Sequence, residues 1–489
     1  MSLVQRFWLT LVAVLTVVVL VLALVGTRLV AGSPLTPAGA PAGPADGAAG
    51  IGDDYLPDAG GGGYDVQHYD VSVTAGAPDD ELRGTTTITA QATQNLDRLH
   101  LDLYLTATSA TVNGTPATLE QSGDDLSIQA VRPDAAAPAI RAGQVFTVTV
   151  EYAGYPERIR ARGTPAYYRK GAEFVIAGEP RSATLWYPAN DHPRDAATMQ
   201  FTVSVPKGSE AVCSGRLLTH GTDPSDAARE RWVWQVDSPT VTYATFLSVG
   251  QFKLEQGVAD GRPYVYAVSE QLSAADQAKA LQWLRGTPAV IDKLEQYLGP
   301  YPFSGAGGFV AATDFYWSGL ETAMRPVYDN KRVGSQSLLN HELAHMWLGN
   351  TVTLTQWNDI FDNESLTSYV EWLTTPRDDP AGIFSYFYNG QANRSGFWGP
   401  PLSDPGRNQL FERVYDRGPM VVHALRTRMG DEAFFALLKG WAQQQGPRSL
   451  EDFRRQADDA TPENLSGFFA EWLDQTDRPD ATRENGVVR

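Results

Sequence analysis

The chain has 489 residues, 43% of them apolar and 10% aromatic, which at roughly 150 residues per domain predicts two to four domains with sizeable cores and excludes a disordered or fibrous chain. Acidic residues outnumber Lys and Arg by 57 to 39, giving a net charge of −18, so we do not expect nucleic acid as a partner. Cys213 is the single cysteine, so any metal must be bound by His, Asp or Glu.

An apolar segment near the N-terminus determines the expected compartment. The residues between Arg6 and Arg28 are uncharged, and as a helix rising about 1.5 Å per residue they would reach roughly 31 Å, enough to cross a bilayer. A cleavable signal peptide has a shorter apolar core of about 7–15 residues, which favours a signal anchor over residues 1–28. Small residues around Ala31 and Ala40 leave cleavage as the alternative. Either way we expect an extracytoplasmic protein, membrane-anchored by a single N-terminal helix or secreted.

A linker and a β-rich domain are predicted next. Residues 29–63 are rich in Ala, Gly and Pro and have little to bury, which is typical of a flexible linker. Over residues 64–255, short runs such as LHLDLYL and QVFTVTVEYA alternate apolar and polar residues and are separated by Gly, Pro, Asn and Asp. This alternation predicts a β-rich domain.

The pattern changes from strand to helix near residue 256. Ser273, followed three residues later by Asp276, is a typical helix N-terminus, and the apolar residues after it recur at helical spacing. We expect helices to dominate residues 256–475, with a polar tail over residues 476–489. The predicted fold class is therefore α+β.

The strongest chemical signal is the sequence HELAH, from His341 to His345, in an apolar segment that predicts a buried helix starting near Ser335. Residues four apart on a helix differ by about 40° in azimuth, so both imidazoles project from one face. Such a pair is typical of zinc ligands, and the adjacent Glu342 can act as a general base on a water without itself binding the metal.

A catalytic zinc needs a third protein ligand, and Glu364 is the candidate. Eighteen residues separate it from the second histidine, and Asp362 or Asn363 can cap a new helix that places it in the first turn. A first-turn carboxylate is also explained by the helix dipole, but beside HELAH this spacing favours a ligand. Glu371, two turns further on, is the competitor, which we interpret as a helix-surface or ligand-supporting carboxylate.

The segments HELAHMWLGN and WNDIFDNES together resemble the pattern HExxH, 18 residues, Glu of the M1 family of zinc aminopeptidases. The resemblance covers roughly residues 64–473 and implies a β-saddle domain followed by a thermolysin-like catalytic domain. It also implies one Zn²⁺ per chain, held by His341, His345 and Glu364. Most members carry a further helical domain over the active site, and because this sequence ends before one could begin we expect a more open cleft.

The segment SGLET lies where that family has the motif Gly-x-Met-Glu-Asn, whose Glu binds the substrate's α-ammonium. The resemblance assigns this role to Glu321. Three of the five motif positions differ, with Ser318, Leu320 and Thr322 in place of Gly, Met and Asn.

Two other segments extend the resemblance. In AGEPRSATLWYPANDHP the second amine-binding side chain falls on Glu179, while Thr184 and Ala177 replace an Arg and a Gln of the family. In ERVYDRG the transition-state tyrosine falls on Tyr415, 51 residues after the third ligand, and Arg417 replaces the family's Lys.

The resemblance implies a role for each of these residues. Glu342 takes the proton from a zinc-activated water, Tyr415 hydrogen-bonds the oxyanion, and Glu321 and Glu179 bind the α-ammonium of the substrate. Only the first peptide bond then reaches the zinc. The expected partners are therefore peptides with a free N-terminus, and also the membrane if residues 1–28 are not cleaved.

Two alternatives remain at this point. An open cleft could admit internal peptide bonds and make the protein a zinc endopeptidase, against which the paired glutamates argue. A non-catalytic peptide-binding protein on a peptidase fold is the other, although all the core catalytic residues are present. Asn358, Asp359 and Asn363 could support the ligand histidines or serve only in turns and caps.

Overall fold

The computed structural model describes residues 46–76, 81–134, 137–159, 165–375, 379–390, 394 and 396–487. The chain divides into two units, residues 1–43 and 44–489, and every described residue belongs to the second. The predicted signal anchor and the first part of the predicted linker lie outside the described residues. Within the described part of the chain, no helix has both the length and the apolarity needed to cross a membrane.

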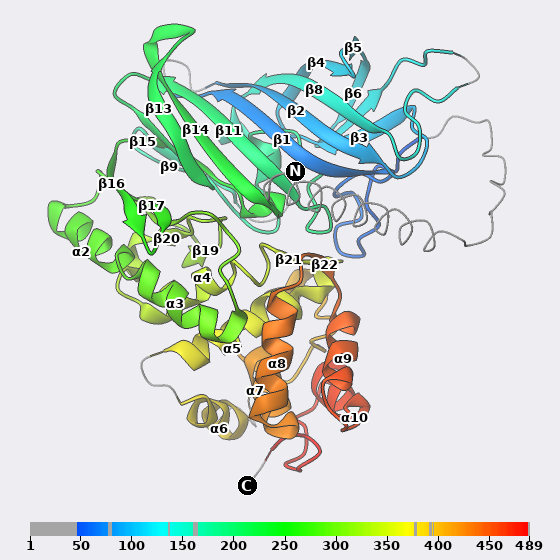
Figure 1. The fold of residues 1–489 in the computed structure, drawn as a ribbon, viewed down its shortest axis with the longest axis vertical. Helices are drawn as coiled ribbons and strands as arrows, with labels where there is room; N and C mark the ends of the chain where they lie inside the picture. Colours follow the sequence, from blue (N-terminus) through cyan, green and yellow to red (C-terminus); the bar gives the residue numbers. More distant parts are fainter. Residues whose placement is uncertain are drawn as a thin grey trace, which may run out of the picture. The chain divides into compact units, whose positions relative to one another are not determined.

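An eight-stranded sheet dominates the first half of the described chain, in the order β13-β14-β11-β1-β2-β8-β4-β5 (Figure 1). Its strands are β1 (Tyr64–Thr74), β2 (Leu82–Ala92), β4 (Thr106–Val112), β5 (Thr115–Pro116), β8 (Val145–Gly154), β11 (Ala197–Pro206), β13 (Arg216–Asp223) and β14 (Asp226–Thr240). Strand β1 pairs parallel with β11 and antiparallel with β2. Buried and exposed residues alternate along β1, as the apolar pattern predicts.

Two smaller sheets complete this β-rich part. The three-stranded sheet contains β3 (Arg98–Asp102), β7 (Asp125–Gln129) and β6 (Thr118–Ser122), and the four-stranded sheet contains β12 (Glu210–Cys213), β15 (Leu247–Gly250), β10 (Glu173–Ile176) and β9 (Tyr167–Lys170). Short 3₁₀ turns lie at η1 (Pro156–Arg158), η2 (Ala183–Leu185) and η3 (Thr242–Ala244). The four-stranded sheet positions the site, because Glu179 follows β10 by three residues.

A five-stranded sheet, in the order β16-β17-β18-β20-β19, begins the second half. Its strands are β16 (Phe252–Ala259), β17 (Arg262–Ser269), β18 (Ala306–Ala311), β19 (Gly319–Leu320) and β20 (Val327–Asp329), and β21 (Val352–Leu354) pairs separately with β22 (Gly446–Arg448). The boundary that we predicted between residues 255 and 256 therefore falls inside β16.

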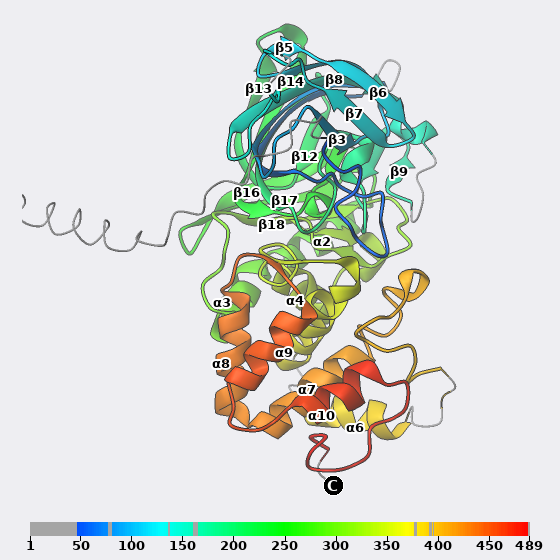
Figure 2. The ribbon, with the colours of Figure 1, turned by 90° about the vertical axis from the view of Figure 1, so that its right-hand side faces the viewer.

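Helices make up most of the remaining chain (Figure 2). They are α2 (Ala274–Leu284), α3 (Thr287–Leu298), α4 (Gln336–Ala344), α5 (Leu366–Thr374), α6 (Pro380–Gly390), α7 (Arg417–Met429), α8 (Asp431–Ala442), α9 (Leu450–Asp459) and α10 (Ser466–Phe469), with shorter turns at η4 (Asn330–Arg332), η5 (Trp357–Asp359), η6 (Phe361–Ser365), η7 (Arg407–Gln409) and η8 (Ala470–Asp474). Ser273 caps α2 and accepts a hydrogen bond from the backbone N–H of Asp276, which confirms the predicted helix start. The α+β prediction is confirmed.

The described end of the predicted linker, residues 46–63, packs into this fold. Asp53 is 2% exposed and accepts hydrogen bonds from Nε2 of His192 at 3.0 Å and from the backbone N–H of Trp357 at 2.7 Å. It therefore ties this segment to both halves of the described chain. A Cβ at Gly61 would lie 2.5 Å from a backbone carbonyl oxygen, so the glycine permits close packing here and is not a sign of flexibility.

The described end of the predicted tail also has contacts with the helices. The Tyr388 hydroxyl donates to the Pro479 carbonyl at 2.6 Å, and the indole N–H of Trp472 donates to the Asn485 carbonyl at 3.0 Å. These bonds hold residues 479–485 against α6 and the C-terminal helices.

Candidate active site

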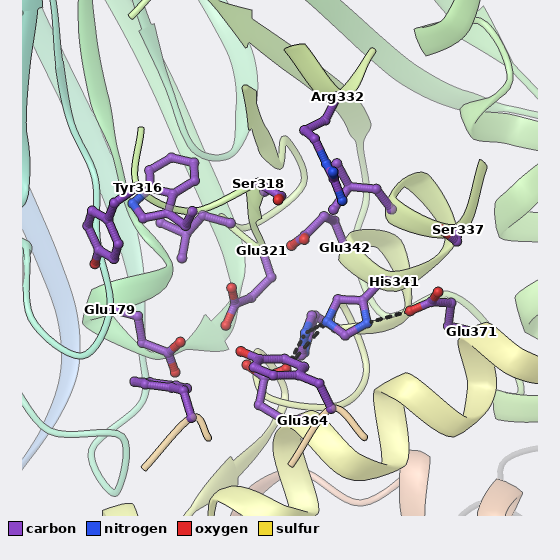
Figure 3. A pocket seen from close by; sticks show the side chains of 17 residues that line it. Glu179, Tyr316, Ser318, Glu321, Arg332, Ser337, His341, Glu342, Glu364 and Glu371 are labelled. Atoms are coloured by element: carbon purple, nitrogen blue, oxygen red, sulfur yellow. Dashed lines mark hydrogen bonds and ion pairs between the residues drawn. The ribbon is translucent and has the colours of Figure 1, made fainter. Parts of the chain in front are cut away.

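A pocket of about 480 Å³ brings together all the residues that the sequence predicts for the site (Figure 3). They are Glu179, Glu321, His341, Glu342, His345, Glu364 and Tyr415. They come from the loop after β10, the loop after β19, helix α4 with its C-terminal cap, the turn η6, and the residues just before α7. Segments far apart in the sequence therefore meet at one pocket.

Helix α4 carries the two histidines and begins where the sequence predicts. Ser335 is its N-cap and accepts a hydrogen bond from the backbone N–H of Leu338. His341 lies within the helix and His345 at its C-cap, so both rings project from one face. Their Nε2 atoms are 3.1 Å apart.

Glu364 reaches these histidines from a π-helical turn. Its Oε2 lies 3.3 Å from Nε2 of His341 and 3.3 Å from Nε2 of His345. The predicted helix start at Asp362 or Asn363 is wrong, because η6 begins at Phe361 and runs directly into α5. One turn of π-helix changes where the side chains of a helix point and is frequent at functional sites.

The second ring nitrogen of each histidine also has a partner. Nδ1 of His341 lies 3.2 Å from Oε2 of Glu371, and Nδ1 of His345 lies 2.9 Å from the carbonyl oxygen of Leu348. Such partners fix the ring orientation and place the proton on Nδ1, which leaves Nε2 as an acceptor. Glu371 therefore supports a histidine, as we interpreted it from the sequence.

The asparagine and aspartate candidates around η5 and η6 have other contacts. Asp359 accepts hydrogen bonds from the backbone N–H groups of Gln356 and Leu450, which is a turn and cap role. Asn363 donates to the hydroxyl of Tyr243 at 3.2 Å. No hydrogen bond in the described part of the chain joins either side chain to the ligand histidines.

The trio of His341, His345 and Glu364 fits a zinc ion. One ligand atom from each lies within 4.8 Å of the others, and Oε2 of Glu364 is buried without a hydrogen-bond partner. With protons on the two Nδ1 atoms, three acceptor lone pairs converge with no donor between them. A cation satisfies all three, and two imidazoles with one carboxylate are a common catalytic zinc set.

His345 and Glu364 each shift the pKa of the other, because opposite charges lie close together in a buried site. Burial alone would lower the pKa of His345, but the Glu364 and Glu321 carboxylates raise it to about 9. Burial alone would raise the pKa of Glu364, but the positive charges of His345 and His341 bring it down to about 2. The site therefore favours positive charge beside an ionised Glu364.

Glu342 lies on α4 between the two histidines, and the backbone of β19 packs against its side chain. It is 4% exposed, and burial raises its pKa to about 8 despite the opposing charges of the two histidines. A Cβ built on Gly319 would lie 2.4 Å from Oε1 of Glu342. The backbone of β19 therefore packs directly on this carboxylate and fixes its position.

Glu179 and Glu321 converge on the neighbouring part of the pocket. One carboxylate oxygen from each lies within 4.8 Å of the other and of Glu364. Burial, and then the charges of Glu321 and Glu364, hold the pKa of Glu179 well above its ordinary value. Two buried carboxylates so close repel each other, so the arrangement favours a bound cation such as an ammonium group.

Glu321 is positioned by residues that the sequence reasoning missed. The side-chain amide of Asn350 donates to its backbone carbonyl at 2.8 Å. Burial raises the pKa of Glu321, and the positive charge of His345 and a hydrogen bond from Tyr243 partly offset this increase. Asn350 ends the quoted HELAHMWLGN segment, which is the one signal that could have identified it. Tyr243 comes from η3 in the β-rich part, and no motif marks it.

Tyr415 and Arg417 are two residues apart, but Tyr415 lines the pocket and Arg417 does not. Tyr415 is 41% exposed, and its ring centre lies 6.0 Å from that of His341. Arg417 is fully buried and donates to the carbonyls of Pro400 at 2.8 Å and Trp472 at 2.9 Å, among others. Arg417 therefore does not line the pocket, and its hydrogen bonds connect backbone segments that lie outside the pocket.

Other residues complete the pocket wall. They are Tyr316, Trp317, Ser318, Gly319, Leu320, Arg332, Ser337, Leu338, Glu371 and Phe411. Most lie in loops or at helix ends, where periodicity gives no information about which side chains meet.

Comparisons with known proteins agree with this geometry. Residues 320–394 match the peptidase family M1 domain. The chain is 24% identical over 328 residues to endoplasmic reticulum aminopeptidase 1 of Rattus norvegicus, covering 61% of this chain and 35% of that protein. It is 25% identical over 469 residues to aminopeptidase N of Lactococcus lactis subsp. lactis, covering 86% of this chain and 52% of that protein. The chain thus spans between a third and about a half of the length of these two relatives.

Solved structures match over most of the described fold. A two-domain M1 zinc metallopeptidase variant bound to L-tryptophan superposes with a TM-score of 0.78 at 25% identity, covering 88% of this chain and 100% of that one. An M1 zinc metallopeptidase variant from Deinococcus radiodurans, bound to a Tyr-Ser-Ala substrate, gives the same TM-score, identity and coverage. The arrangement of a β-rich part followed by a helical part is that of these two-domain structures.

Proposed function

Because the chain belongs to peptidase family M1, we propose that it is a zinc-dependent aminopeptidase that removes the N-terminal residue from peptides. The convergence of Glu179 and Glu321 beside the trio is the observation that carries this proposal. An α-ammonium bound between these carboxylates places the first peptide bond, and no later one, at the trio. An endopeptidase has no need of this acidic pair.

Each group of residues in the pocket has a separate role in the proposed reaction. His341, His345 and Glu364 would hold one Zn²⁺, which when bound supplies Lewis acidity and an activated water. Glu342 accepts the proton of the attacking water and delivers it to the nitrogen of the departing amine. Tyr415 donates a hydrogen bond to the oxyanion that forms on the scissile carbonyl carbon.

The proposed setting is extracytoplasmic, with the protein membrane-anchored or secreted. The apolar sequence of residues 1–28 supports this proposal. Carbonate washing of membranes tests it, because an anchored chain stays in the pellet, whereas a cleaved chain is released and starts after the apolar segment. A full-length chain in the cytosolic fraction would contradict export.

One peptide in two forms tests the activity. The purified protein with zinc is incubated with an unstructured peptide that carries either a free or an acetylated N-terminus, and the products are followed by mass spectrometry. We expect stepwise loss of residues from the free form alone, and no turnover by the Glu342→Ala variant, which should still bind zinc. Internal cuts in both forms would establish the endopeptidase alternative, and full activity of Glu342→Ala would refute the assigned base.

A further inference from the structure

The active-site pocket has a single cationic side chain at neutral pH apart from its histidines. Among the described residues that line it, five are glutamates and Arg332 is the one Lys or Arg. Arg332 is exposed and ends η4. In the described part of the chain its guanidinium has no hydrogen bond or ion pair, whereas the adjacent Lys331 is paired with Asp314 at 2.5 Å. Arg332 is therefore available to a ligand in the pocket.

Arg332 lies at the end of the pocket opposite the amine-binding pair. The carboxylates follow one another from Glu179 to Glu321 and then to Glu342, since each successive pair shares a cluster of close oxygens. Figure 3 shows Arg332 and Ser337 beyond Glu342, on the side away from Glu179. A peptide whose ammonium is bound at Glu179 and Glu321 can extend its remaining residues past Glu342 toward Arg332.

The spacing along α4 indicates how far a peptide must extend. Ser337 precedes Glu342 by five residues, which is about 7.5 Å along a helix axis. An extended peptide covers about 3.3–3.6 Å per residue, so this length corresponds to about two residues beyond the scissile bond. For a peptide that runs parallel to α4, the C-terminal carboxylate of a tripeptide reaches the end of the pocket that Ser337 and Arg332 line, while that of a longer peptide passes it.

We propose that Arg332 binds the C-terminal carboxylate of short peptides, so that tripeptides with a free carboxylate are preferred substrates. The proposal rests on the aminopeptidase function proposed above. A planar guanidinium pairs with a carboxylate through two parallel hydrogen bonds. Elsewhere in the pocket the glutamates repel a carboxylate, so glutamates at one end and Arg332 at the other are complementary to a zwitterionic peptide.

A length series of peptides tests this assignment. Leu-initiated peptides of two to six residues are compared as free acids and as C-terminal amides, with wild-type protein and the Arg332→Ala, Arg332→Lys and Lys331→Ala variants. For the tripeptide we expect wild type to favour the acid by about 5- to 20-fold in kcat/KM, a modest factor because Arg332 is exposed. The ratio should fall to about one for six residues.

The variants distinguish a specific contact from general electrostatics. Arg332→Ala should bring the acid-to-amide ratio of the tripeptide to about one, and Arg332→Lys should keep part of it because a lysine pairs with a carboxylate through a single point charge. Lys331→Ala, the matched control, should leave the ratio unchanged. An equal loss in both alanine variants, or an unchanged ratio in Arg332→Ala, would overturn the proposal.

A binding measurement separates this proposal from the proposed function. In the Glu342→Ala background, calorimetry measures the affinity for the tripeptide acid and amide with and without the additional Arg332→Ala change. We expect the acid to bind more tightly only when Arg332 is present, and equal affinities would refute its role. If no peptide with a free N-terminus is hydrolysed by wild type, the aminopeptidase proposal fails, whereas the binding result still decides the role of Arg332.

Discussion

Gly319 provides a direct test of whether the position of Glu342 determines turnover. Gly319 lies in β19 and pairs with Tyr328 of β20 in an antiparallel register. It is not among the residues with positive φ, so an alanine fits the backbone. The added Cβ would lie 2.4 Å from Oε1, 2.7 Å from Cδ and 2.9 Å from Cγ of Glu342. The side chain of Glu342 must therefore move.

The distance by which the Glu342 carboxylate moves determines the expected fall in kcat. Ordinary van der Waals contact begins at 3.4 Å, so the carboxylate oxygen must shift by about 1 Å. A misplacement of about 1 Å can cost roughly 100-fold in rate, equivalent to about 2.7 kcal/mol at about 1.36 kcal/mol per tenfold. We expect Gly319→Ala to lower kcat by about this factor with little change in KM, since the residues that bind the ammonium are not displaced.

The assay measures kcat and KM on a peptide with a free N-terminus, together with zinc content and melting temperature. Both of the latter should match wild type, because the trio is not in contact with the added methyl group. Gly440 on α8 is the matched control, since a Cβ there would lie no closer than 3.4 Å to any neighbour. A Gly319→Ala variant with wild-type kcat would refute the argument that β19 positions the catalytic base.

Four further substitutions have defined outcomes. Glu179→Gln and Glu321→Gln should each raise KM for peptides with a free N-terminus by about 10-fold in steady-state kinetics, through loss of a charge-assisted bond to the ammonium group. Arg417→Met leaves several buried carbonyls without a donor and should lower the free energy of unfolding by about 3–5 kcal/mol in urea titrations. The pKa of Asp53 is about 2 against 3.8, because hydrogen bonds from His192 and from backbone N–H groups outweigh burial. That depressed pKa stabilises the fold by about 2 kcal/mol above pH 4 and less as pH falls toward 2, so Asp53→Asn should flatten the stability profile over this range.

Local patterns were sufficient to predict α4 and the placement of its two histidines on one face. The N-cap at Ser335 and the two histidines four residues apart depend on interactions within one helix, which the sequence specifies directly. The 18-residue spacing placed Glu364 at the correct side of the pocket even though the helix start was wrong. The π-helical turn could not be read from the sequence, because apolar periodicity does not distinguish one turn of π-helix from an α-helical turn.

Residues whose role depends on long-range contacts were not predictable. Tyr243 lies 78 residues before Glu321 in the sequence, yet its hydroxyl influences the pKa of the Glu321 carboxylate. Arg332 carries no motif, and its relevance comes only from the acidic residues that other segments place in the same pocket. The sequence suggested flexibility for residues 46–63 from their composition, but composition does not distinguish a linker from a glycine-rich segment that follows a surface closely.

Three of the departures from the family's motifs lie in the scaffold around the pocket. Thr322, in place of Asn, uses its hydroxyl to donate to the carbonyl of Arg325 at 2.7 Å in the turn after β19. Ala177 is fully buried, and its backbone N–H donates to Ala166 at 2.9 Å. Arg417 holds backbone carbonyls outside the pocket. Each of these positions now serves the scaffold, whereas the charged groups still converge on one pocket, because the chemistry depends on where charges lie and tolerates changes in the residues that support them.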